Sequence, residues 1–396
     1  MKFDSLVVHA GDRKRNGGVI PSATPIHLGT TYFYESAAKL DRVFGHEEEG
    51  FSYARYNNPT SEALEELTTA MEGGHGSLAC ASGMAALQIA FQAALMDRAP
   101  RIVAAQSIYG ASIKLFDQVF GSLGVETHYV DICDLNAVEQ AIAERKPGCV
   151  FMEVVSNPLL RVGSVDEVAK LAKAAGSALV VDNTFSTPML LQPLALGANM
   201  VVHSATKYLA GHGDVLGGIV VSDKEHHEVV RSLSSISGPV LGPFESYLTM
   251  RGIKTLALRF ERQCDNACKL ANWLSSHPQV DRVHYPGDPR HPDAATVKRL
   301  FAPGMFGGMV SFELKDAGKQ EVMAFMDRLK MVVPGTSLGD VHTLLLYPVM
   351  ASHRDVAPKV RARMGIKENL VRISAGIEAV DDIIADLDGA LRGSRS

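Results

Sequence analysis

One lysine, Lys207, follows two hydroxyl side chains at the end of an apolar stretch. The segment "VVHSATKYLAGHGDVLGG" spans residues 201–218, and Ser204 and Thr206 precede the lysine within it. A lysine at the end of a strand is ordinarily solvated. Here a glycine-rich segment follows directly, which favours an anionic ligand that the backbone approaches closely. The segment therefore predicts a ligand site in which Lys207 takes part.

A carboxylate ends the preceding apolar stretch. In "ALVVDNTF", Asp182 follows four apolar residues. Ligands of open α/β sheets sit beyond the carboxyl ends of the strands, so a polar residue at this place is a candidate binding group. From the sequence alone, Asp182 is equally well interpreted as a cap for the next segment or as a group aimed at a ligand.

A third candidate lies upstream, where "CASGMAALQIA" places Ser82, Gly83 and Met84 at a strand-to-helix junction. The first amides of a helix lack partners within the helix and lie at its positive end, so they bind phosphate. The turn is too short for a P-loop, and no GxGxxG occurs at this turn, which disfavours a nucleotide-dependent dehydrogenase. We therefore expect a single phosphate group here.

These three features together match the requirements of one cofactor. Pyridoxal phosphate (PLP) needs a lysine for its Schiff base, a carboxylate that keeps the ring nitrogen protonated, and donors for its phosphate. A free lysine with a pKa of about 10.4 is a poor nucleophile, and a site that disfavours its charge makes it reactive. The sequence thus predicts a PLP site built on Lys207, Asp182 and the helix start at Gly83.

The elements that must position these residues alternate from residue 59 onward. Continuous apolar strand-like runs indicate a largely parallel sheet with both faces covered by helices. The expected strands lie at 77–81, 101–105, 125–131, 149–155, 178–182 and 199–204, with helical segments between them and a first helix beginning after Asn58.

The regular alternation of strand-like and helix-like segments ends near residue 250. We expect one long helix over about 243–276, strands at 309–314 and 369–377, and a closing amphipathic helix at 380–391, which together indicate a smaller α/β domain. The first 58 residues carry few periodic signals and are interpreted as an arm that lies against something else. The predicted division is an arm at 1–58, a PLP-binding domain at 59–250 and a C-terminal domain at 251–396.

Bulk composition excludes several classes of protein. The 396 residues are 46% apolar and 21% charged, and the net charge of −5 gives no footprint for nucleic acid or an anionic membrane. Five cysteines without CxxC spacing are interpreted as reduced thiols, and no metal site is expected. No secretion signal and no bilayer-spanning apolar run is apparent. The prediction is a cytoplasmic protein whose partners are small molecules or copies of itself.

With these motifs in view, the chain resembles the Cys/Met-metabolism family of PLP-dependent enzymes, the γ-subfamily of fold type I. The resemblance implies an α/β fold, with a large domain on a mainly parallel seven-stranded sheet, a smaller C-terminal α/β domain and an extended N-terminal arm. It rests on ordered motifs along nearly the whole chain: "PIHLGTTY", "YARYNNPT", "ASGMAA", "YGAS", "SNPLL", "VVDNTFSTP", "HSATKYLAGHGDVLGG", "TSLGD" and "LVRISAGIE".

Residue roles follow from this resemblance. Lys207 is similar to the Schiff-base lysine of the family, Asp182 to the partner of the pyridinium nitrogen, and Tyr109 to the tyrosine that stacks on the ring and assists proton transfers. The resemblance places the phosphate among Ser82, Gly83, Met84, Ser204 and Thr206. Without the family, Tyr109 alone would be interpreted as a half-buried core aromatic residue.

The resemblance also implies which residues bind the substrate and which reach the active site of a neighbouring subunit. Arg372 is similar to the arginine that grips the substrate carboxylate with two hydrogen bonds, helped by Ser337 and Asn157. Tyr53 and Arg55 match a Tyr-x-Arg motif that reaches the phosphate of a neighbouring subunit, and Tyr53 also borders the substrate. This implies a homotetramer made of two dimers, in each of which the two subunits share their active sites. Taken without the family, these two residues would belong to a surface loop.

The implied reaction is γ-elimination or γ-replacement on sulfur amino acids or homoserine esters, as in cystathionine γ-synthases and γ-lyases. Acidic residues of cystathionine-processing members are replaced by Ser52 and Thr336, and the cysteine of dedicated methionine γ-lyases by Ala111. Methionine γ-lyase and O-acetyl- or O-succinylhomoserine sulfhydrylase therefore stay open as alternatives. A non-catalytic interaction protein that kept the fold is disfavoured, because Lys207 and Asp182 are intact.

Overall fold

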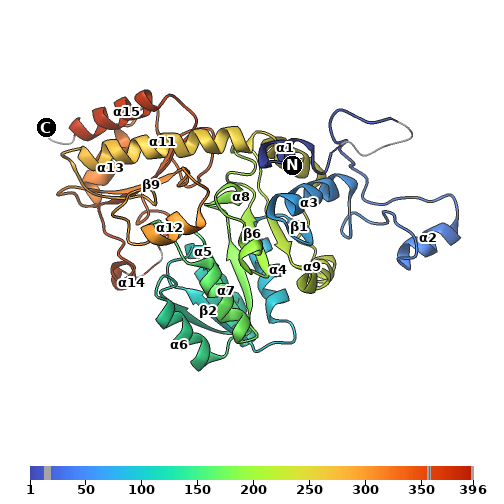
Figure 1. Ribbon diagram of the computed structural model, residues 1–396. Helices are drawn as coiled ribbons and strands as arrows, with labels where there is room; N and C mark the ends of the chain where they lie inside the picture. The colour runs from blue at the N-terminus through green and yellow to red at the C-terminus, as the bar shows by residue number, and fades with distance from the viewer. Residues whose placement is uncertain (13–18, 355, 357, 394–396) are drawn as a thin grey trace.

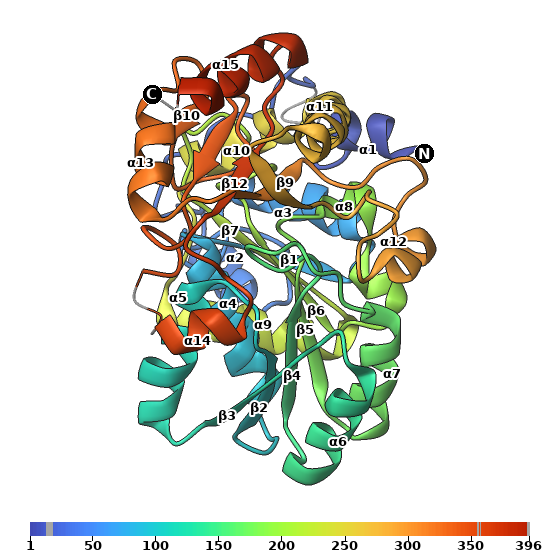
Figure 2. The same ribbon diagram turned by 90° about the vertical axis from the view of Figure 1, so that its left-hand side faces the viewer.

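Two sheets organise the chain, in a computed structural model that describes residues 1–12, 19–354, 356 and 358–393 (Figures 1 and 2). The larger sheet has seven strands, in the spatial order β1 (Gly76–Cys80), β7 (Gly218–Ser222), β6 (Met200–Ser204), β5 (Ala178–Asp182), β4 (Cys149–Glu153), β2 (Arg101–Ala105) and β3 (Glu126–Val130). The smaller has five, in the order β10 (Val333–Pro334), β11 (Leu344–Leu346), β12 (Leu370–Ser374), β9 (Met309–Leu314) and β8 (Val280–His284).

The larger sheet is mainly parallel, as the apolar runs predict. Strands β3, β2, β4, β5 and β6 pair in parallel, and only β7 runs antiparallel to both its neighbours, β1 and β6. Strand β7 was not expected from the sequence, because this five-residue strand follows the glycine-rich segment directly. Strands β4 to β7 consist of buried residues except for Asp182 and Ser204, which stand at strand ends. These two polar residues indicate that a functional site lies at the carboxyl ends of β5 and β6.

Helices cover both faces of this sheet. On one side lie α4 (Gly83–Leu95) and α9 (Lys224–Ser237), and on the other α3 (Pro59–Glu72), α6 (Leu135–Arg145) and α7 (Val165–Ala174). Shorter elements complete the domain: α5 (Gly110–Lys114), a π-helical turn η1 (Leu115–Phe120), 3-10 turns η2 (Gly121–Leu123) and η3 (Pro193–Leu196), and α8 (Thr187–Leu190).

The smaller sheet carries its helices on its outer side, while its other side faces the larger sheet (Figure 2). Its outer helices are α11 (Leu256–Ser276), α13 (Lys319–Asp327) and α15 (Val380–Arg392), and α12 (Ala294–Leu300) and α14 (Pro358–Arg363) lie in its connections. Two hydrophobic cores correspond to the two sheets.

Helix boundaries follow local chemistry, with one correction to the expected pattern. Helix α3 begins where predicted, because Asn58 accepts hydrogen bonds from the first-turn amides and Pro59 occupies the first position. The expected single helix over 243–276 is instead two, α10 (Pro243–Ile253) and α11, which meet at Lys254 and Thr255. A side chain at Gly252 would come within 2.2 Å of the Ala210 carbonyl oxygen, so the end of α10 is pressed against the Lys207 segment.

The first 58 residues divide into a docked and a projecting part. Helix α1 (Phe3–His9) packs on α3 with Val7 fully buried, whereas α2 (Ala37–Phe44) lies away from the body (Figure 1). Large apolar side chains of this segment face outward: Phe33 is 94% exposed and Leu28 74%. Such a surface favours contact with another molecule. No helix within the described residues has both the length and the apolar character to cross a membrane.

Candidate active site

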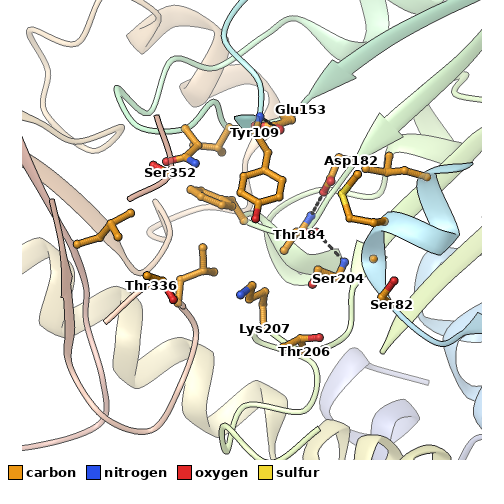
Figure 3. Close-up of a pocket in the computed structure, with 18 of the residues that line it drawn as sticks. Ser82, Tyr109, Glu153, Asp182, Thr184, Ser204, Thr206, Lys207, Thr336 and Ser352 are labelled. Carbon is orange, nitrogen blue, oxygen red and sulfur yellow. Dashed lines mark hydrogen bonds between the residues drawn. The ribbon is translucent and has the colours of Figure 1, made fainter. Parts of the chain in front are cut away.

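A cavity of about 220 Å³ opens at the carboxyl ends of β4, β5 and β6, between the two sheets (Figure 3). It brings together residues that are far apart in sequence. Those predicted for the site that line it are Ser82, Gly83, Met84, Tyr109, Asn157, Asp182, Ser204, Thr206, Lys207 and Arg372. The cavity therefore gathers cofactor and substrate candidates around one space.

Lys207 lies just beyond β6, in the segment that joins β6 to β7. Its Nζ donates to the Ser337 hydroxyl oxygen at 2.9 Å. Burial, and then the positive charge of Arg372, lower the pKa of Lys207 to about 8. A neutral amine is the form that attacks a carbonyl carbon, so this environment makes the lysine reactive near neutral pH.

The segment that carries Lys207 is anchored from the second sheet's longest helix. Arg259 of α11 is buried, and its guanidinium donates to the carbonyl oxygens of Tyr208 at 3.0 Å, Leu209 at 3.3 Å and Gly252 at 2.8 Å. One side chain thereby bonds two carbonyl groups of the turn after Lys207 and one carbonyl group in the last turn of α10. This anchor fixes the position of Lys207 relative to α11.

Asp182 ends β5 and faces the cavity. Its Oδ1 accepts the Thr184 amide at 2.8 Å, and burial raises the pKa of the carboxyl group above its ordinary value. A protonated ring nitrogen placed against it would supply the opposite charge that a buried carboxylate requires. Both of the interpretations that the sequence left open thus find support, since Asp182 caps the next turn and also faces the cavity.

The phosphate candidates converge at the start of α4. Ser82 is the N-cap residue, and its hydroxyl accepts the Ala85 amide at 3.1 Å. A side chain on Gly83 would lie 2.9 Å from the Ser204 Cβ, so only glycine allows strand and helix to approach this closely. Thr206 accepts the Gly217 amide at 3.0 Å. The positive end of α4 and the Ser204 hydroxyl together suit an anion.

Arg372, in β12 of the smaller sheet, also lines the cavity. It is 3% exposed, and its Nη1 donates to the Asn157 Oδ1 at 2.6 Å and its Nη2 to the Ser337 carbonyl oxygen at 3.4 Å. Its buried Nε has no partner among the described residues, and burial lowers the pKa of the guanidinium to about 10. A buried cation with unused donors suits a carboxylate.

Tyr109 presents its ring to the cavity and is 46% exposed (Figure 3). Its amide donates to the Oε1 of Glu153 at 2.6 Å. Glu153 was not predicted for the site, although an acidic residue inside the apolar run "CVFMEVV" was a signal that could have found it. Other wall residues carry no such signal and were also not predicted, namely Leu87, Val155, Thr184, Phe185, Leu216, Leu338, Leu346 and Ser352.

Tyr53 and Arg55 are predicted site residues that the structure does not bring to this cavity. Arg55 donates to the Ser235 carbonyl oxygen and lies over the Tyr56 ring, 4.7 Å from its centroid. Ser337 is also absent from the lining, but it contacts Lys207 directly.

The donors of the cavity fit PLP. A deprotonatable lysine, a buried carboxyl group, a helix start that contains Gly83 and the ring of Tyr109 share one space. Among the residues that the structure describes, one carboxyl oxygen of Glu153 and the Nε of Arg372 have no hydrogen-bond partner. These are the functions that PLP requires of its protein.

Comparison with known proteins agrees. The family described as "Cys/Met metabolism PLP-dependent enzyme" matches residues 4–392. An L-methionine gamma-lyase of Fusobacterium nucleatum subsp. polymorphum is 38% identical over 98% of this chain and 97% of its own. A cystathionine gamma-lyase of Bacillus subtilis is 39% identical over 99% of each.

A solved cystathionine gamma synthase of Xanthomonas oryzae pv. oryzae, in complex with aminoacrylate and cysteine, superposes with a TM-score of 0.92 at 34% identity, covering 100% of this chain and 98% of that one. The predicted fold type I architecture and the predicted cofactor are confirmed. The chain belongs to the Cys/Met-metabolism family of PLP-dependent enzymes.

Proposed function

We propose that this enzyme performs γ-elimination or γ-replacement on sulfur amino acids or homoserine esters, as cystathionine γ-synthases and γ-lyases do. One observation supports the proposal: Lys207, whose pKa is lowered, lines the same cavity as the start of α4 and the hydrogen-bonded pair of Arg372 and Asn157. An amino acid held by its carboxylate at Arg372 would present its amino group towards Lys207.

We assign the residues separate roles. PLP, when bound, supplies the electron sink for carbanion chemistry. Lys207 holds the cofactor and, once free, moves protons at the α- and β-carbons. Asp182 holds a proton on the ring nitrogen and Tyr109 covers the ring. Arg372 binds the substrate carboxylate, with Asn157 fixing its guanidinium.

Replacing Lys207 with alanine tests the assignment. The purified wild type should absorb near the visible edge, and Lys207→Ala should lose that band and its turnover. A matched control is Lys254→Ala, which removes a lysine that pairs with Asp12 outside the cavity and should keep both. Turnover retained in Lys207→Ala would refute the proposal.

The choice of substrate depends on the wall that faces the side chain of a bound amino acid. In the cavity, Thr336 and the apolar Leu338 and Leu346 form a wall that offers no charge to a distal ammonium group. This supports a substrate whose γ-substituent carries no ammonium group, so methionine γ-lyase and homoserine-ester sulfhydrylase remain as alternatives to the cystathionine reactions. Incubation with O-acetylhomoserine, O-succinylhomoserine, cystathionine or methionine, each with and without a thiol, separates them. Without acceptor, 2-oxobutyrate identifies a lyase, and a new thioether or homocysteine identifies replacement.

We further propose a cytoplasmic homotetramer whose arms, residues 1–58, lie against neighbouring subunits, with domains at 59–250 and 251–396. The exposed Phe33 and Leu28, and the position of Tyr53 and Arg55 outside their own cavity, support this. Mixed subunits test it: Arg55→Ala and Lys207→Ala chains, each inactive alone, should regain activity when unfolded and refolded together. No recovery would argue against shared sites.

A further inference from the structure

Glu153 is a buried carboxyl group for which the reaction proposed above has no use. It ends β4, and its Cα pairs in register with that of Asp182 at the end of β5. Side chains of paired residues in neighbouring parallel strands share a face, and both carboxyl groups line the cavity. Two acids therefore stand side by side at the wall where a cofactor ring would lie.

The two oxygens of Glu153 have different surroundings. Oε1 accepts the Tyr109 amide at 2.6 Å, whereas Oε2 is buried and has no partner of good hydrogen-bond geometry among the described residues, although the nearby Asn157 amide also favours the ionised form of the carboxyl group. An ionised carboxylate with one bare buried oxygen is costly, but a protonated one is not. Without a bound cation, these surroundings favour a neutral acid at this position.

The groups around Glu153 and Asp182 also favour a protonated carboxyl group at this position. The neighbouring charged or titratable groups are Asp182, Lys207, Tyr109, Arg372 and, from β6, His203. Burial and then the charge of Asp182 raise the pKa of Glu153 well above its usual range, although the Tyr109 and Asn157 amides and Arg372 act against this. Neighbouring buried carboxyl groups do not both ionise readily.

We propose that Glu153 and Asp182 form a carboxyl pair that holds one shared proton in the cofactor-free site and releases it to solvent when PLP binds. The cationic ring nitrogen supplies the charge that lets both groups ionise. Glu153 is then a positioning residue with two tasks: it anchors the Tyr109 turn through Oε1, and it supplies the second negative charge near the ring. The inference rests on the proposed function, because it requires PLP against Asp182.

Two substitutions separate these tasks. Glu153→Gln keeps an acceptor for the Tyr109 amide and removes the titratable proton. Glu153→Asp keeps the acid but shortens the side chain by one methylene, so it loses reach to that amide. Glu313→Gln is the control, because Glu313 is also buried but lies in β9 and bonds to His284 and Lys367.

The experiment is calorimetric titration of each cofactor-free protein with PLP in buffers of different ionisation heat, which counts the protons exchanged. Compared with wild type, Glu153→Gln should release close to one proton fewer, while Glu153→Asp and Glu313→Gln keep the wild-type count. Glu153→Asp should bind PLP about tenfold more weakly, because one hydrogen bond to a charged group is lost. Equal proton counts for Glu153→Gln and wild type would overturn the proposal.

A measurement on the unmodified protein gives a second test if the variants fold poorly. Infrared difference spectra of the wild type should show a carboxylic-acid C=O band that disappears when PLP is added. A band that is absent before addition contradicts the inference. Failure of the proposed function would look different, since the wild type would then form its visible absorbance band with PLP but turn over none of the sulfur amino acids or homoserine esters.

Discussion

Gly83→Ala should damage cofactor binding through a clash that the surrounding backbone cannot relieve. The new Cβ would lie 2.9 Å from the Ser204 Cβ and 3.0 Å from its Cα, where carbon atoms normally keep about 3.5–4.0 Å. Ser204 is held on both sides, because its amide donates to the Thr184 hydroxyl at 2.9 Å and its Cα pairs with Gly218. Gly218 has no room either, since a Cβ there would meet the Ser82 carbonyl oxygen at 2.1 Å.

The expected cost follows from this geometry. Overpacking of this kind destabilises by about 1–3 kcal/mol, and the misdirected amides at the start of α4 should raise the Kd for PLP about tenfold or more. Differential scanning fluorimetry of the cofactor-free protein and titration with PLP measure the two effects. Gly389→Ala is the control: Gly389 lies within α15, and a Cβ added there would meet no described atom within 4 Å, so alanine should stabilise by about 0.5–1 kcal/mol. An unchanged Kd and melting temperature in Gly83→Ala would refute the reasoning.

Two further predictions concern titration. The pKa of Lys207 is lowered to about 8. The rate at which the cofactor-free protein binds PLP, followed by stopped-flow absorbance, should therefore increase with pH, and the midpoint of the increase should lie near pH 8. A midpoint above about pH 10 would contradict the lowered pKa. Burial alone would raise the pKa of Asp293, but its hydrogen bonds with Arg161, at 2.6 and 2.8 Å, and with the Val162 amide lower it. Its stabilisation is therefore present above the unfolded-state pKa and lost as pH falls through the lower folded value. Urea unfolding of Asp293→Asn should show a smaller free energy at about pH 7 and a flatter acid limb than wild type, and parallel curves would count against this.

Those parts of the site in which a reactive or charged side chain lies at or just after the end of a strand were predictable from the sequence. Asp182 ends an apolar run and Lys207 closely follows another, and the open α/β rule places such ends together, so the amino acid sequence alone implies their convergence. The helix start at Gly83 follows from capping rules in the same way. Arg372 was conspicuous because a strand interior rarely carries an unpaired cation.

Other features depend on contacts that no local pattern records. Leu338 and Leu346 look like any core residues, and only the tertiary fold turns them towards the cavity. The break between α10 and α11 lies close to the contact of Gly252 with Ala210, a tertiary contact that the local sequence does not record. Strand β7 was missed because it follows the glycine-rich segment directly, and its place in the sheet depends on pairing with β1 and β6.

The Arg259 anchor limits how the protein can be divided. Its three acceptor carbonyls belong to residues 208, 209 and 252, while the guanidinium comes from the helix that covers the smaller sheet. A fragment ending at residue 250 would carry the nucleophile yet leave the Tyr208 and Leu209 oxygens bare. Truncation or domain exchange after residue 250 should therefore disorder the segment around Lys207 even where the larger sheet still folds. The two domains thus depend on each other for an active site.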